Sequence, residues 1–251
     1  MSKQNQIIIA IAAAIALGLA VLFGSGTSTQ NAANETNDTG NMSQSEAQSE
    51  GASDDAGASG AAAPSDLGPL ETPNPLGEIT LGDKNAPVTI VEYSSLTCPH
   101  CGAFHRDTLP TLKEKYIDKG LVRIHFRPFP FDPYATAGAM LAHCVAPKAQ
   151  VTFLDILFKR QQQWLQSEQP MDVLQGFAKQ GGLSETDFII CLKDQNRLDA
   201  IRQIQSTAAE ELGVRSTPTF FINGKKLEGN VPLSEFEKLL KPALADFEGA
   251  Q

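Results

Sequence analysis

Cysteine is scarce in this chain, with four residues among 251, and only two of them lie close together. These two form the segment Cys98-Pro99-His100-Cys101, and no second Cys-x-x-Cys pair is present. A structural zinc site usually needs two such pairs, or one pair and two nearby histidines. Attachment of haem requires a histidine directly after the second cysteine, where this chain has Gly102. The pattern argues against both sites, and we predict neither a metal nor another cofactor.

Apart from Met42, large apolar side chains are missing from residues 25–66, which contain no Leu, Ile, Val or aromatic residue. Such a segment cannot bury enough apolar surface to offset the conformational entropy that is lost on ordering. We therefore predict that residues 25–76 are a disordered linker rich in Ser, Ala, Gly and Asn. This linker separates residues 1–24 from a C-terminal domain at 77–251.

An excess of positive charge is also absent. Residues 1–76 hold one lysine and eight acidic residues, so most of the net charge of −9 lies outside the C-terminal domain. That domain is nearly neutral and has no basic stripe, which argues against nucleic acid as a partner. Its length of about 175 residues is sufficient for one domain with a sizeable core.

Only one long hydrophobic run occurs, at residues 7–24, which are uncharged and mostly apolar. Its length is close to the lower limit for a transmembrane helix and slightly exceeds the core of a signal peptide. No clear Ala-x-Ala cleavage site follows, which favours an uncleaved membrane anchor over a signal segment. Lys3 on the N-terminal side agrees with the positive-inside rule. Both alternatives export the domain.

The hydrophobic pattern of residues 77–251 predicts an α/β fold. Residues 87–95 are β-branched and apolar almost throughout, as in a strand buried on both faces, and residues 121–127 alternate like a second strand. The helix predicted between them ends at Gly120, and Pro110 either kinks it or starts its second segment. The other predicted elements are helical segments near 133–147, 149–166, 171–180, 184–193 and 196–212, a hairpin at 217–229 with its turn at Asn223-Gly224, and a helix at 232–247.

The position of the Cys-x-x-Cys pair favours a reactive role over a structural disulfide. A bond between Cys98 and Cys101 would close a very small loop and restrain the unfolded chain little. Cys98 lies where a helix is predicted to begin, and unpaired backbone N–H groups there lower the pKa of a thiol and favour its reactive thiolate. Cys101, one turn further, is predicted to be the buried resolving thiol. Between them, next to Pro99, His100 is predicted to favour the thiolate by a charge or a hydrogen bond.

The other two cysteines, Cys144 and Cys191, are 47 residues apart. A disulfide that closes a long loop stabilises a fold by constraining the unfolded chain, and an exported domain meets oxidising conditions. We therefore predict a structural disulfide between them, with two free buried thiols as the alternative.

Several separated motifs now resemble one family. CPHC after a buried strand, with Thr217-Pro218-Thr219 before FFING, resembles the thioredoxin fold and, within it, the DsbA-type thiol:disulfide oxidoreductases. RPFPFDPYATAGAMLAHC and FKRQQQW are similar to the alphaproteobacterial branch of that family. The resemblance covers residues 77–251 and implies a thioredoxin fold with a helical insertion at about 132–213. It also implies that Pro218 is a cis-proline facing the active-site disulfide and that the backbone of Thr217 pairs with the bound peptide.

Glu92 and Thr217 are two further residues for which the sequence and the resemblance predict a role. Glu92 lies six residues before Cys98 within an apolar strand, where a buried acid is costly unless it is paired or functional. The resemblance matches it to the family's buried acid, which implies that it accepts or relays the proton of Cys101; the alternative is an acid at an exposed strand end. Thr217 stands where enteric oxidases of the family usually have valine. Threonine is frequent in the disulfide isomerases, so isomerase or mixed activity stays open.

The sequence thus predicts an exported enzyme that introduces disulfide bonds into unfolded or reduced substrate proteins through Cys98 and Cys101. The resemblance implies a second partner, a membrane reoxidase of the DsbB type. It also implies a periplasmic location, with residues 7–24 holding the domain at the inner membrane unless cleavage releases it. The alternatives are a disulfide isomerase or reductase and a copper-binding module, in which His100 or His105 would add a ligand to the thiolates.

Overall fold

The computed structural model describes residue 70 and residues 74–249. The predicted membrane segment at 7–24 and nearly all of the predicted linker lie outside these residues. Within the described part, no helix is both long and apolar enough to cross a membrane. Leu70 and Asn74 belong to the predicted linker and are nevertheless buried, so packing against the domain begins before residue 77.

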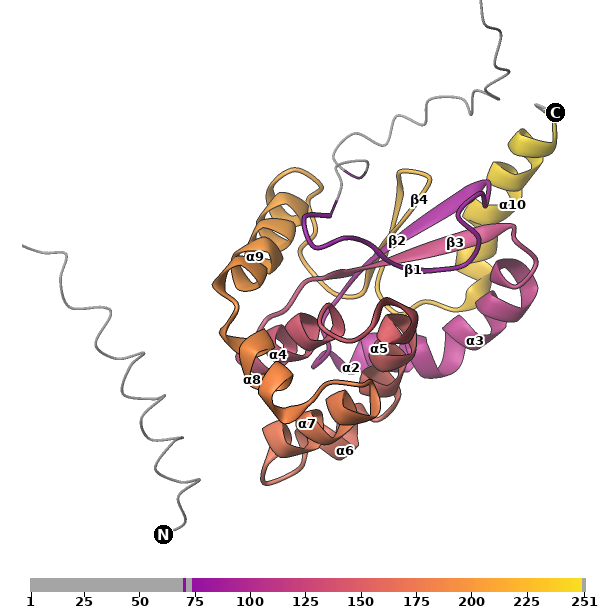
Figure 1. Cartoon of the computed structure of the whole chain (residues 1–251). Coiled ribbons are helices and arrows are strands. Elements are labelled where there is room, and N and C mark those ends of the chain that lie inside the picture. Colours follow the sequence, from indigo (N-terminus) through magenta and orange to yellow (C-terminus); the bar gives the residue numbers. More distant parts are fainter. Residues whose placement is uncertain (1–69, 71–73, 250–251) are drawn as a thin grey trace, which may run out of the picture. The chain divides into compact units, whose positions relative to one another are not determined.

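The core of the domain is a mixed five-stranded sheet with the order β1-β3-β2-β4-β5 (Figure 1). The strands are β1 (Ile79–Leu81), β2 (Val88–Ser94), β3 (Val122–Pro128), β4 (Thr219–Ile222) and β5 (Lys225–Glu228). Strands β2 and β3 are parallel, and every other neighbouring pair is antiparallel. A parallel pair needs a crossover connection, which the helical segment after CPHC supplies. Strand β1 was not predicted, because three residues are too few to show a period-two alternation.

Helices cover the sheet and form the predicted insertion between β3 and β4. The helical segments are α2 (Pro99–Ala103), η3 (Phe104–Thr108), α3 (Leu109–Leu112), η4 (Lys113–Ile117), α4 (Pro133–Ala142), η5 (Pro147–Ala149), α5 (Gln150–Lys159), α6 (Gln161–Leu165), α7 (Pro170–Gln180), α8 (Glu185–Lys193), α9 (Gln195–Glu210) and α10 (Leu233–Gly249). Pro110 lies in the first turn of α3, where its missing N–H costs little. The predicted helix at 149–166 is two helices, because the chain turns at Arg160 with φ −100° and ψ 20°. The α/β thioredoxin fold with a helical insertion is confirmed.

The two faces of the sheet carry different cores. Side chains of successive strand residues alternate between faces. Val91, Tyr93 and Phe221 lie on one face and pack in a small core with residues of α9. The other face contributes to the larger core, which includes Phe126. Glu92 pairs in register with Phe126 and so points toward this larger core.

The predicted hairpin joins β4 to β5 at Asn223-Gly224. Both residues have positive φ, 43° and 82°, as a tight hairpin turn requires. The backbone N–H of Thr89 donates to Asn223 Oδ1 over 2.9 Å, and the Asn223 N–H donates to the Thr89 carbonyl over 3.0 Å. These bonds tie the turn to β2.

A buried arginine holds the segment before β1 on the sheet. Arg127 is 6% exposed, and its Nη2 donates to Glu78 Oε1 over 2.6 Å and to the Leu70 carbonyl over 3.0 Å. Its Nη1 donates to the hydroxyl of Tyr93 over 3.1 Å. The buried charge is therefore paired and hydrogen-bonded, which offsets its desolvation cost.

Candidate active site

The end of β2 and the start of α2 position the Cys-x-x-Cys pair. Cys98 is the N-cap of α2, with the extended backbone that this position requires, and Pro99 follows at the first helical position. Cys98 is partly exposed, whereas Pro99 and His100 are exposed. Cys101 is fully buried. One thiol of the pair is therefore open to a partner protein and the other is enclosed.

The Cys98 thiol is strongly acidified. Its pKa is lowered from the usual 9.0 to about 5, mainly by a hydrogen bond with the Cys101 thiol. Partial burial opposes this effect, and the Thr217 side chain and the backbone N–H groups of Cys101 and His100 add to it. His100 thus acts on Cys98 through its backbone, a contribution that residue identity does not reveal. At neutral pH the Cys98 side chain is largely a thiolate, which is the nucleophilic form.

The Cys101 thiol is, in contrast, much less acidic than usual. Burial strongly raises its pKa, and the hydrogen bond with Cys98 and the charge of Glu92 raise it further. Cys101 therefore keeps its proton at neutral pH. Any step in which Cys101 acts as a nucleophile needs a group that accepts this proton.

A loop that is distant in the sequence lies against Cys98. The Thr217–Pro218 peptide bond is cis, as predicted, and the Cys98 thiol donates to the Thr217 carbonyl over 3.3 Å. The Thr217 hydroxyl is buried and has no hydrogen-bond partner among the residues that the structure describes. It is therefore available to the Cys98 sulfur.

Glu92 is completely buried on the core side of β2. This excludes the alternative of an acid at an exposed strand end. Its ionisable neighbour is His105, whose Nε2 lies 3.4 Å from Glu92 Oε1. Neither carboxylate oxygen has a hydrogen-bond partner within residue 70 and residues 74–249. The acid is thus paired with an imidazole but not saturated by donors.

Gln161 is a site residue that the sequence did not single out. It is 4% exposed at the start of α6, and its Nε2 donates to the carbonyls of Leu96 and Cys98, each over 2.8 Å. A Cβ atom on Gly102 would lie 2.8 Å from Gln161 Oε1, so a larger residue there would require the Gln161 side chain to move. The insertion thereby fixes the loop that carries Cys98. The motif FKRQQQW contains Gln161 among three consecutive glutamines, which gave no reason to choose it.

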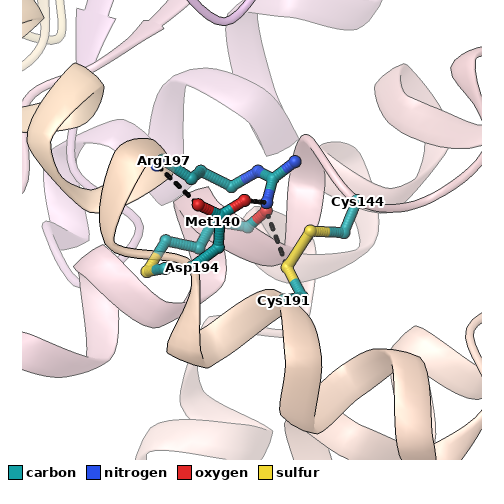
Figure 2. The surroundings of a disulfide bond; sticks show 5 residues. All are labelled: Met140, Cys144, Cys191, Asp194 and Arg197. Carbon is teal, nitrogen blue, oxygen red and sulfur yellow. Dashed lines mark hydrogen bonds and ion pairs between the residues drawn. A yellow bond between two sulfur atoms is a disulfide. The ribbon is translucent and has the colours of Figure 1, made fainter.

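The structure contains the predicted disulfide between Cys144 and Cys191, with a Cα–Cα distance of 6.2 Å. Figure 2 shows that it joins the chain just after α4 to α8, inside the helical insertion. The Cys191 sulfur lies 3.3 Å from the Met140 carbonyl oxygen. Arg197 and Asp194 form an ion pair beside it.

The copper-binding alternative finds no support in the described part of the chain, where no group of three or more His, Cys, Asp or Glu side chains could hold a metal ion. His105, which that alternative would use, is 1% exposed and contacts Glu92 and Asp155.

Comparisons with known proteins agree with this geometry. The sequence profile of the thioredoxin family matches residues 75–242. A Rickettsia typhi protein provisionally named a protein-disulfide oxidoreductase is 29% identical over 170 residues, which cover 67% of this chain and 63% of that protein. The chain thus spans less than two thirds of the length of this relative.

Solved structures show the same fold. Wolbachia pipientis alpha-DsbA1 is 33% identical, with a TM-score of 0.64 over 71% of this chain and 98% of that one. BdbD from Bacillus subtilis, at 23% identity, shares the fold with a TM-score of 0.59 over 67% of this chain and 93% of that one.

Proposed function

This chain belongs to the thioredoxin family and is a DsbA-like member of it, and from that membership we propose that it introduces disulfide bonds into substrate proteins by dithiol–disulfide exchange. The observation that carries the proposal is the acidified, partly exposed Cys98 thiol beside the cis Thr217–Pro218 loop, with Cys101 buried behind it. An accessible thiolate and an enclosed, protonated partner are the two components that such exchange needs.

The proposed reaction begins with the Cys98–Cys101 disulfide. A substrate thiolate attacks Cys98 Sγ, the bond to Cys101 breaks, and Cys101 takes the electron pair and a proton. A second thiolate of the substrate then attacks the substrate sulfur of the mixed disulfide, and Cys98 leaves as a thiolate. The substrate loses two electrons, and the cysteine pair gains them. The low pKa of Cys98 makes it a good leaving group in the second step.

The same low pKa favours the oxidising direction. At pH 7, a shift from 9.0 to about 5 stabilises the reduced pair by about 2.7 kcal/mol. Solvent screening at this partly exposed thiol reduces that figure to about 1–2 kcal/mol. For a two-electron couple this corresponds to a reduction potential about 20–40 mV more oxidising than that of an unperturbed pair.

An isomerase or reductase is the competing role, because Thr217 stands at a position where threonine is frequent in the disulfide isomerases. Those activities require the dithiol form to be maintained. We favour the oxidase because the thiolate is stabilised by several donors at once.

We further propose that the domain works in the periplasm, exported by residues 7–24 and tethered to the inner membrane unless that segment is cleaved. A membrane reoxidase of the DsbB type would return the cysteine pair to the disulfide. Fractionation of cells that express the full chain tests this location. Recovery of the protein in the cytoplasm with Cys98 and Cys101 reduced would contradict it.

The reduction potential of the full chain is the direct test of the oxidase. The protein is equilibrated with glutathione buffers, and alkylation with mass analysis follows Cys98 and Cys101 separately from Cys144 and Cys191. We expect a potential above that of thioredoxin, which is about −270 mV, and oxidation of a reduced, unfolded test protein.

A matched variant controls the assay. Cys98→Ala should abolish the transfer of disulfides, whereas a Cys144→Ala/Cys191→Ala variant should retain it. A thioredoxin-like potential, with disulfide reshuffling but no net oxidation, would instead favour the isomerase or reductase.

A further inference from the structure

Three side chains from different elements form a row in which each member lies within 4 Å of the next. Glu92 of β2 lies 3.4 Å from His105 Nε2, and the opposite nitrogen, Nδ1, lies 3.8 Å from Asp155 Oδ1 of α5. Glu92 and His105 are 0% and 1% exposed, whereas Asp155 is 33% exposed. We propose that His105 is a positioning residue and proton relay, which carries the Cys101 proton between Glu92 and the surface carboxylate of Asp155. This inference rests on the proposed function.

The row contains polar atoms that stability alone does not explain. Both oxygens of Glu92 and both ring nitrogens of His105 are buried, and none has a hydrogen-bond partner in the described part of the chain. Burying such groups without hydrogen bonds costs free energy. A well-packed apolar pair of similar volume avoids that cost. An acid and an imidazole kept together in a core are therefore better explained by proton transfer.

The ring of His105 is held in one orientation by aromatic neighbours. It stacks on Phe158 with ring centroids 3.9 Å apart and an interplanar angle of 18°, and it also contacts Phe126 and Phe104. These contacts direct one nitrogen to each carboxylate. An imidazole can accept a proton at one nitrogen and release another from the second. The orientation thus suits relay between two acids that do not touch each other.

The charged surroundings stabilise the protonated form that this imidazole takes up during relay. Burial disfavours its protonated form, but the carboxylates of Glu92 and Asp155 outweigh burial and raise the pKa of His105. Asp155 also pairs with Lys159 Nζ at 2.8 Å. On the inner side, the charge of Glu92 contributes to the raised pKa of Cys101. Glu92, Asp155, Lys159 and Cys101 are thus the titratable groups that face this relay.

The relay acts when the active-site disulfide is formed again. In a mixed disulfide at Cys98, Cys101 gives its proton to the Glu92 carboxylate, and the Cys101 thiolate attacks Cys98 Sγ. The bond to the partner sulfur breaks, and the partner leaves as a thiolate with the electron pair. Glu92 passes its proton to Nε2 of neutral His105, and the Nδ1 proton goes to Asp155 and then to water. When a substrate is oxidised, the proton moves along the same residues in the opposite direction, toward Cys101.

The test separates the two chemical steps. The reduced full chain is mixed with oxidised glutathione, quenched in acid at short times and analysed by mass. Formation of the Cys98–glutathione mixed disulfide depends on Cys98, and closure to the Cys98–Cys101 disulfide depends on loss of the Cys101 proton. We expect His105→Gln to leave the first step within about twofold and to slow closure at pH 7 about 10- to 100-fold, in the range of general-base catalysis.

A matched histidine variant is the control for packing. His125 is half-buried on β3, and its Nδ1 is hydrogen-bonded to Thr80 Oγ1 over 2.7 Å. His125→Gln should leave both steps unchanged. Because Glu92 and His105 act in one path, the Glu92→Gln/His105→Gln variant should close no more slowly than Glu92→Gln alone.

The outcomes distinguish this inference from the proposed function. If the wild-type chain forms no mixed disulfide, the proposed function fails. If it does, and folded His105→Gln closes at the wild-type rate and with the wild-type pH profile, the relay is wrong.

If His105→Gln does not fold, nuclear magnetic resonance of the wild-type His105 ring replaces the variant. The relay predicts that the pKa of this ring differs between the oxidised and reduced protein. Identical titration in the two states overturns it.

Discussion

The two cysteine pairs of this domain have the same chemistry but lie in contrasting surroundings. Cys98 and Cys101 are separated by two residues at the start of a helix, and one of them is open to partner proteins. Cys144 and Cys191 are 47 residues apart and join α8 to the chain after α4 within the insertion (Figure 2).

The contrast shows that the neighbours of a sulfur decide whether a disulfide is reactive or structural. Backbone N–H groups of His100 and Cys101 stabilise a negative charge on Cys98, which favours the reduced pair. Each pair also has one sulfur 3.3 Å from a carbonyl oxygen, Cys98 near Thr217 and Cys191 near Met140, so this contact does not distinguish the two sites. A bond that closes 47 residues also constrains the unfolded chain far more than one that closes a tetrapeptide.

The largest expected effect comes from removing the structural pair. A Cys144→Ala/Cys191→Ala variant should lose about 4 kcal/mol of unfolding free energy, the chain-entropy value for a loop of this length. Exchange at Cys98 should change less than about twofold. Urea denaturation, with Cys98 and Cys101 held in one redox state, measures the loss. A loss below about 1 kcal/mol would show that this disulfide is not structural.

A second effect is the pH dependence of the reactive pair. The pKa of Cys98 is lowered in the folded reduced protein, so its ionisation contributes stability fully above the unfolded pKa of 9.0 and loses it as pH falls through about 5. Cys101 contributes nothing below pH 9.0, because it stays protonated in both states.

The free energy of unfolding of the reduced protein, relative to that of the oxidised protein, should therefore rise by about 1–2 kcal/mol between pH 4 and pH 7, after allowance for solvent screening. Urea denaturation of both redox forms across this range measures the gain. A difference that does not vary with pH would contradict the thiolate assignment.

The Thr217→Val variant tests how much a single hydroxyl contributes to the acidity of Cys98. Loss of this donor should raise the pKa of Cys98 by about one unit, since a hydrogen bond to a charged group contributes about 1.5 kcal/mol or more. The protein should become less oxidising. Thiolate absorbance during a pH titration measures the shift. Thr219→Val is the control, because the Thr219 hydroxyl donates to the Ser216 carbonyl and not to Cys98.

The smallest effect is expected for His100→Ala. The substitution retains the backbone N–H that acts on Cys98 and removes only an exposed ring. The protein should become less oxidising, with a pKa change at Cys98 of less than about half a unit. A change larger than that of Thr217→Val would restore the His100 side chain as the main source of thiolate stability.

Local pattern in the sequence was sufficient for much of the fold. The apolar run of β2 and the helical insertion follow from side-chain period and from glycine and proline positions. Strand β1 was too short for such a signal. The helical pattern of residues 149–166 continues through Arg160, so it did not reveal the break between two helices there. The cis bond at Pro218 came only from resemblance to a family, because peptide isomerism is not visible in the spacing of residues.

The sequence by itself determined which residues carry chemistry: two cysteines at a strand–helix junction, a second pair at a distance suited to a structural bond, and an acid in an apolar strand. Tertiary structure alone decided how they act. Burial and neighbouring donors set the acidity of each thiol, and packing brought Gln161 to the Cys98 loop and His105 to Glu92. The physical reason is that pKa values and proton paths depend on distance and desolvation, which residues far apart in the chain establish only when the fold is complete.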